Sequence, residues 1–211
     1  MVKSFERWEF EELQITFGLK RLKSMPILEQ WLANETEFTA VEKQELERLQ
    51  NKLQDNAEVW NEDELKFFFL SHLIDLVGYE SPYYKAFTQR KLSATIGNIE
   101  LTGVVDYMIA TGIQNPRQPF FFIHEYKQER KREADPLGQV LSEMLAAQAK
   151  NEYRYPIFGS YVVGRLWFFV VLAENQYSVS LAYDSTKDDI FKIVSILRKV
   201  KDYIEEYLKL L

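Results

Sequence analysis

The chain has 211 residues, a formal net charge of −6 and a hydrophobic fraction of 46%. It has no cysteine and only two histidines, which excludes disulfides, thiolate metal sites, a cysteine nucleophile and a cage of several histidines. The acidic balance argues against a passive nucleic-acid-binding protein, because such proteins are usually basic. No apolar stretch approaches the roughly 20 residues of a membrane helix, so we expect a cytoplasmic protein without membrane contact.

The first 56 residues indicate a helical N-terminal appendage. Apolar residues recur there at helical spacing, and Thr39 with Glu42 forms a capping box that opens a helix running to about Asp55. This segment contains no motif that suggests chemistry. We therefore predict two parts, an appendage over residues 1–56 and a main domain over residues 57–211.

The main domain is predicted to combine three helices with two runs of strands. Helices are expected at 58–77, 137–151 and 186–209, and strands at 84–95, 99–110, 119–127, 157–163, 166–173 and 177–183. Asp135 is the expected N-cap of the second helix, with Pro136 in its first turn. The segment from Ser185 to Asp188 resembles a capping box before the last helix. This order indicates a mixed α/β domain.

The residues that could carry chemistry lie on two consecutive strands. Alternation along the strand at 119–127 gives one face to four residues: Phe121, Ile123, Glu125 and Lys127. Burying Glu125 and Lys127 costs free energy unless each has a partner. Asp106 lies inside the preceding apolar strand, and antiparallel pairing would bring it close to Glu125. Two explanations stay open, an ion pair or a site for Mg²⁺ or Mn²⁺, whose preferred ligands are hard oxygens.

Two helices supply further candidates. In the helix at 58–77, Glu62 faces the apolar stripe, whereas Glu64 lies roughly 120° away from it. The alternative explanation for Glu62 is a first-turn carboxylate stabilised by the helix dipole. Gln139 in the helix at 137–151 points away from the apolar side of that helix, toward a cleft or toward solvent.

The candidate residues form one pattern: an acid in the first helix, an aspartate on one strand, Glu-x-Lys on the next strand, and then a helix. This pattern resembles the PD-(D/E)XK nuclease superfamily. The matching segments are WNEDELK with Glu62, GVVD with Asp106, HEYK with Glu125 and Lys127, and DPLGQ with Gln139. Together with YVVGRLWFFVVL, they are also similar to a group of uncharacterised bacterial proteins related to these nucleases. The similarity covers about residues 57–185. The proline in the family's name is absent, because Val105 precedes Asp106.

The resemblance implies a restriction-endonuclease-like fold with an αβββαβ core, and a metal-dependent nuclease acting on nucleic acid, DNA rather than RNA. It assigns Asp106, Glu125 and Glu62 to Mg²⁺ or Mn²⁺. It gives Lys127 the task of orienting the attacking water or stabilising the transition state, and Gln139 an accessory role. Two alternatives stay open: a non-catalytic scaffold that binds nucleic acid or protein, and a hydrolase of small phosphoesters. A homo-oligomer is compatible with each.

Basic residues gather around the candidate site. Between residues 85 and 132, eight basic and four acidic residues give a net charge of +4, whereas the rest of the chain carries −10. A positive rim around an acidic centre suits a polyanionic backbone. The predicted backbone contacts are Arg90, Lys91, Arg130, Lys131 and Arg132. The alternative is that the segment QERKRE is a solvated turn.

Overall fold

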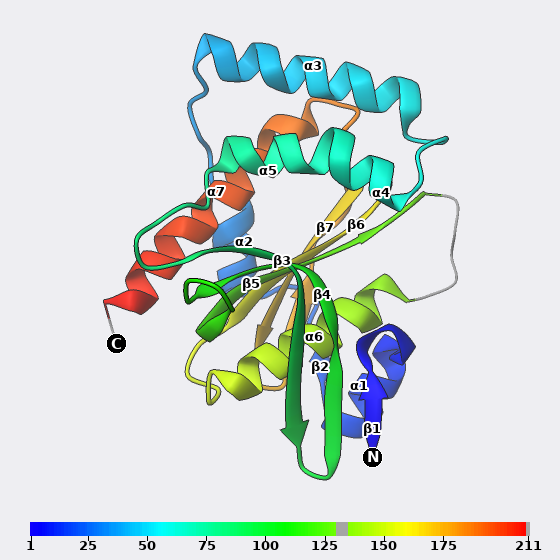
Figure 1. The fold of residues 1–211 in the computed structure, drawn as a ribbon, viewed down its shortest axis with the longest axis vertical. Coiled ribbons are helices and arrows are strands. Elements are labelled where there is room, and N and C mark those ends of the chain that lie inside the picture. The colour runs from blue at the N-terminus through cyan, green and yellow to red at the C-terminus, as the bar shows by residue number, and fades with distance from the viewer. Residues whose placement is uncertain (130–134, 210–211) are drawn as a thin grey trace.

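One mixed sheet organises the part of the chain that the computed structural model describes, residues 1–129 and 135–209 (Figure 1). Its strands are β1 (Val2–Ser4), β2 (Lys20–Arg21), β3 (Lys85–Ile96), β4 (Ile99–Thr111), β5 (Arg117–Lys127), β6 (Ile157–Val163), β7 (Leu166–Ala173), β8 (Gln176–Val179) and β9 (Tyr183–Asp184). Their order in the sheet is β1-β4-β5-β6-β7-β8-β2, with β3 paired to β4 and β9 paired to β7. The pairs β1–β4, β5–β6 and β2–β8 are parallel, and the others are antiparallel.

Helices cover both faces of this sheet, as Figure 1 shows. The α-helices are α1 (Phe10–Phe17), α2 (Pro26–Leu32), α3 (Ala40–Asn56), α4 (Glu62–Leu65), α5 (Ser71–Val77), α6 (Pro136–Lys150) and α7 (Asp189–Leu208); η1 (Phe5–Arg7) is a 3₁₀-helix and η2 (Lys66–Leu70) a π-helix. The first core joins one face to α2, α3, α5 and α7, and the second joins the other face to η1, α1 and α6. Covering on both faces explains why the central strands are almost continuously apolar.

Most predicted elements of the main domain are confirmed, with differences at their ends. The helix expected at 58–77 begins at Glu62, because Asn61 forms a capping box with Glu64, and it contains the π-helical segment η2. The predicted capping box before the last helix is wrong. The Ser185 hydroxyl donates to the carbonyl oxygen of Arg165 instead of capping α7. The strand expected at 177–183 is two short strands, β8 and β9.

The N-terminal segment contains strands as well as the expected helices. β1 pairs with β4, and β2 pairs with β8, in the same sheet as the rest of the chain. Three-residue and two-residue strands are too short for the sequence to show a period of two. The segment also packs tightly on α6, since a Cβ added to Gly138 would lie 2.2 Å from the carbonyl oxygen of Trp8. Division of the chain at residue 56 stays a prediction, but residues on its N-terminal side contribute to both cores.

A β-bulge in β5 changes the faces of its first residues. Phe121 has no partner on β4, between the paired residues Phe120 and Phe122. Phe121 therefore packs in the first core with Phe122, and its predicted place on the face of Ile123 is wrong, because a bulge inserts one extra residue into a strand. Alternation holds from Phe122 onward, so Ile123 lies in the α6 core and Glu125 follows it on that side.

One ion pair joins three helices of the first core. Arg198 in α7 donates to the Glu42 carboxylate in α3, and to the carbonyl oxygen of Leu76 in α5 at 2.8 Å. Glu42 also accepts from the backbone N–H of Thr39 at 2.7 Å, which completes the predicted capping box. Hydrogen bonds from Thr39 and Arg198 lower the pKa of Glu42 to about 2.

We expect Glu42→Gln to lower the free energy of unfolding by about 1 kcal/mol at pH 6, because the capping geometry survives while the charge is lost. A carboxyl group with a lowered pKa stabilises the fold above its ordinary pKa and loses this effect as the pH falls toward the folded value. The deficit should therefore shrink between pH 5 and pH 3 in urea titrations. Glu47→Gln, an exposed change on the same helix, is the control. If Glu42→Gln lowered the free energy of unfolding by the same amount at pH 5 and pH 3, this account would be contradicted.

Candidate functional site

All five predicted catalytic residues line one cleft of about 370 Å³ at the α6 side of the sheet. Asp106 comes from β4, Glu125 and Lys127 from β5, Glu62 from the first turn of α4, and Gln139 from α6. The remaining lining residues are Glu6, Asp63, Lys66, Gln89 and Val104. The sequence therefore identified residues that the fold brings together, whereas their catalytic roles stay predictions.

Antiparallel pairing of β4 with β5 brings the two strand acids together. The ladder ends at Tyr107 opposite His124, and Asp106 and Glu125 directly follow this last pair on their strands. One oxygen of Asp106, Oδ2, accepts the backbone N–H of Tyr126 at 3.1 Å. The proximity of Asp106 raises the pKa of Glu125, although burial of Glu125 contributes more to this rise.

Glu125 and Lys127 form an ion pair, so each of these buried charges has the partner that its burial requires. Lys127 Nζ lies 2.6 Å from Glu125 Oε1; the Glu125 side chain is 1% exposed and that of Lys127 is 21% exposed. Burial lowers the pKa of Lys127, but Glu125, with smaller contributions from Glu62 and Asp106, outweighs burial, so the net pKa is raised. The other carboxylate oxygen of Glu125, Oε2, is buried and has no hydrogen-bond partner among the described residues.

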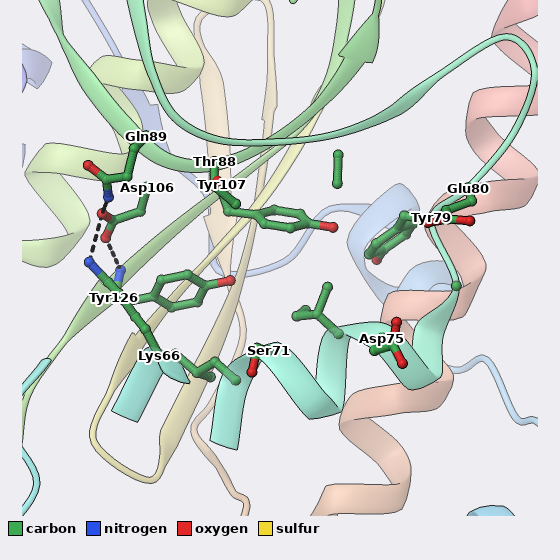
Figure 2. Close-up of a pocket in the computed structure, with 14 residues that line it drawn as sticks. Lys66, Ser71, Asp75, Tyr79, Glu80, Thr88, Gln89, Asp106, Tyr107 and Tyr126 are labelled. Atoms are coloured by element: carbon green, nitrogen blue, oxygen red, sulfur yellow. Dashed lines mark hydrogen bonds and ion pairs between the residues drawn. The ribbon is translucent and has the colours of Figure 1, made fainter. Parts of the chain in front are cut away.

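A lysine joins Glu62 to the strand acids. Lys66 Nζ lies 2.7 Å from Glu62 Oε1. It also lies 2.9 Å from Asp106 Oδ1, a contact that Figure 2 shows. Burial would lower the pKa of Lys66, but Asp106 and Glu62 together raise it. Lys66 was not among the predicted site residues. Its spacing of four from Glu62 is the signal that could have found it, and it begins η2, a type of helix that is frequent at functional sites.

Gln139 faces the cleft, the first of the two directions that the sequence left open. It is 3% exposed, and its Nε2 donates to Glu143 Oε1 at 3.2 Å. Glu143, also missed from the sequence, is completely buried, and burial followed by the charge of Glu125 raises its pKa well above the ordinary value. Both lie on the polar side of α6, which η1 and α1 cover: the Ser142 hydroxyl contacts the carbonyl oxygen of Phe5 at 3.5 Å.

Gln89 on β3 is a third residue that the sequence did not reveal. Its Nε2 donates to Asp106 Oδ1 at 2.6 Å (Figure 2), and its backbone has φ of 51°. A positive φ is uncommon for residues other than glycine and costs free energy, and such residues cluster at functional sites. Asp106 therefore receives hydrogen bonds from three elements, β3, β5 and η2.

The oxygen atoms of the cleft fit a hard divalent cation in part. Within the described part of the chain, two lining residues have a buried side-chain oxygen without a hydrogen-bond partner, Glu125 Oε2 and Gln139 Oε1. Glu143 Oε2, on the residue that Gln139 contacts, is also unpaired. Carboxylate and amide oxygens suit Mg²⁺ or Mn²⁺, and a cation would satisfy atoms that are costly to leave unpaired. Within residues 1–129 and 135–209, however, no group of three or more aspartate, glutamate or histidine side chains is already placed to hold a metal ion. Lys66 and Lys127 contact carboxylate oxygens that a cation would use.

Two of the predicted nucleic-acid contacts lie beside the cleft. Arg90 and Lys91 are exposed on β3, and Lys91 lies opposite Val104, which lines the cleft. Arg130, Lys131 and Arg132 lie outside the described residues. Within the described residues, the predicted positive rim therefore consists of the two exposed basic residues on β3.

Comparison with known proteins adds no relative: no family model matches the chain, and no curated protein matches it. In the part of the chain that the structure describes, no helix is long and apolar enough to cross a membrane. The resemblance to nucleases thus rests on the residues in the cleft and on the order of the elements that carry them.

We expect Glu143→Gln to unfold at a higher urea concentration than the wild type at pH 8 in EDTA. A carboxyl group with a raised pKa destabilises the fold as the pH rises above its ordinary pKa, because the unfolded chain ionises freely. Glutamine cannot ionise, so the gain should be about 1.4 kcal/mol or more, the equivalent of one pKa unit, and should shrink toward pH 5. Glu206→Gln on the exposed side of α7 is the control. Equal stability of Glu143→Gln and wild type at pH 8 would show that Glu143 is adequately paired.

Proposed function

We propose that the chain is a metal-dependent nuclease with a restriction-endonuclease-like fold, hydrolysing phosphodiester bonds of nucleic acid, with DNA as the expected substrate. The observation that carries the proposal is the convergence of Asp106, Glu125, Lys127 and Gln139 on one cleft that contains unpaired buried oxygens. The element order α5-β3-β4-β5-α6-β6 agrees with the core that the resemblance implies. The exposed residues Arg90 and Lys91 provide positive charge near the cleft for a nucleic-acid backbone.

Oxygen ligands for the cation come from two strands and a helix. Asp106 and Glu125 would hold Mg²⁺ or Mn²⁺, with Glu62 contributing directly or through water. When bound, the cation supplies Lewis-acid stabilisation of phosphate charge and a lower pKa for bound water. Gln89 and the Tyr126 backbone N–H hold Asp106 in place, because each donates to one of its two oxygens.

The lysines supply positive charge at the reacting phosphate. Lys127 has a raised pKa and a side chain that is 21% exposed, so its charged Nζ can reach a phosphate oxygen or orient the attacking water at the mouth of the cleft. Lys66 has the same properties, at 23% exposure. Gln139 binds Glu143 and lines the wall of the cleft, which suits the accessory role.

We expect wild-type protein to cleave DNA in the presence of Mg²⁺ or Mn²⁺, and Lys127→Ala and Asp106→Ala each to reduce the rate by about 10²–10⁴-fold, the typical contribution of one such group. Lys150→Ala at the exposed end of α6 is the matched control and should keep the full rate. The measurement is single-turnover cleavage of labelled DNA and RNA. Unchanged activity in both cleft variants would overturn the assignment of the site.

The ion pairs support a second candidate, a nuclease-fold scaffold that binds nucleic acid or protein without catalysis. Lys127 already pairs with Glu125 at 2.6 Å, and Lys66 pairs with Asp106 at 2.9 Å, so these acids have partners without any cation. A buried ion pair gives each charge a partner, although Glu125 Oε2 has none among the described residues. The two candidates differ in whether metal binds to the folded protein.

We expect Mn²⁺ at 100 times its dissociation constant to raise the melting temperature of the wild type by about 5–10 °C, since a ligand that binds only the folded state stabilises it. Glu125→Gln should abolish this rise, whereas Glu47→Gln on α3 should retain it. The measurement is differential scanning calorimetry in a buffer that does not chelate metal. No rise in the wild type would favour the scaffold over the nuclease.

A further inference from the structure

A second cavity, of about 500 Å³, adjoins the catalytic cleft (Figure 2). Lys66, Gln89 and Asp106 line both spaces, so a molecule in this cavity lies against residues that also face the cleft. The volume lies within the roughly 300–1,000 Å³ of pockets that hold small ligands. The proposed mechanism leaves this cavity unused.

The inner wall of the cavity is aromatic. It contains Tyr79 from the loop after α5, Tyr107 from β4 and Tyr126 from β5, with Leu70 and Ile74 completing the apolar lining. Figure 2 shows the rings of Tyr107 and Tyr126 extending from the side of Asp106, with their hydroxyl groups directed away from it. Lys66 Nζ lies 5.9 Å from the centre of the Tyr126 ring, on the cleft side of this wall. Flat aromatic walls of this kind favour a flat aromatic ligand.

One polar atom in this wall lacks a partner. The hydroxyl group of Tyr107 is buried without a hydrogen bond, and the residue is only 6% exposed. The Tyr79 hydroxyl, by contrast, donates to the carbonyl oxygen of Leu197 at 2.7 Å. This hydroxyl has almost no accessible surface, so it belongs to the interior of the wall and does not reach a ligand in the cavity.

Charge at the cavity indicates which part of a nucleotide it accepts. Asp75 and Glu80 are exposed acids among its lining residues, and they repel a phosphate group. Of the two lysines, Lys66 lines both spaces at their junction, and Lys127 lines the cleft alone. A base carries no charge, and its N–H groups can donate to carboxylates and hydroxyl groups.

We propose that this cavity holds the base of the nucleotide whose phosphate occupies the catalytic cleft, an inference that rests on the proposed function. The base packs against the tyrosine wall and the apolar side chains of Leu70 and Ile74. The three shared residues, Lys66, Gln89 and Asp106, then separate base from phosphate. Such a base must be unpaired to enter, so the substrate is single-stranded or has its base turned out of the duplex.

Binding without cleavage tests the base pocket independently of catalysis. Single-stranded DNA with one 2-aminopurine is titrated with wild-type protein in EDTA, and stacking on tyrosine should quench its fluorescence. Ala86→Phe, which fills the cavity from β3, should reduce affinity about 10-fold or more, within the range expected for one stacked base. Thr16→Phe, which lines a separate cavity, should behave as wild type.

Cleavage of a modified substrate completes the test. With Mg²⁺ or Mn²⁺, an abasic residue placed at successive positions should reduce cleavage by about 10-fold or more at the neighbouring phosphate only. Cleavage at equal rates on abasic and intact DNA, with no quenching, would overturn the base pocket while the proposed nuclease stands. Quenching that Ala86→Phe removes, without any cleavage, would support the pocket but overturn the nuclease. If neither quenching nor cleavage were observed, both the base pocket and the proposed nuclease would be overturned.

Discussion

Burial of carboxylate oxygens between the sheet and α6 is the constraint on which the rest of the cleft depends. A buried charge without partners is expensive, and Glu125 and Glu143 are almost fully enclosed. The surrounding residues reduce this cost: Lys127 contacts Glu125, and Gln139 contacts Glu143. Oxygens that remain unpaired after these contacts are the reason to place a cation or a protonated acid in the cleft.

Enclosure of these acids depends on the N-terminal segment. Phe5 and Trp8 are 1% exposed and pack against α6, and Asp135 caps both α6 and α1 by accepting from the N–H groups of Leu137 and Phe10. Without this cover, the polar side of α6 would face solvent, as its periodicity alone suggests. The low dielectric of the cleft is therefore a property of residues far apart in the sequence, and it strengthens every charge interaction in it.

The sequence predicted the long elements and the residues that meet in the cleft, because strand alternation and helical periodicity are local properties. It could not show that α6 is covered on both sides, so Glu143 went unnoticed and the direction of Gln139 stayed open. The bulge at Phe121 shifts one residue between faces without any local sign. Gln89 reaches Asp106 through an unusual backbone angle, and the contact of Lys66 with Asp106 spans 40 residues. Such features arise from tertiary contacts, which no single segment encodes.

The two short N-terminal strands also affect how the chain reaches its fold. Val2 pairs with Glu100, and Lys20 pairs with Gln176, so these strands must wait for partners made much later in synthesis. Contacts between distant parts of a sequence form slowly, because loop closure costs entropy before any contact is gained. The segment that covers α6 is thus expected to be among the last parts to dock during synthesis. Until then the buried acids remain hydrated, and the cleft acquires its final electrostatic character only when this N-terminal segment takes its place.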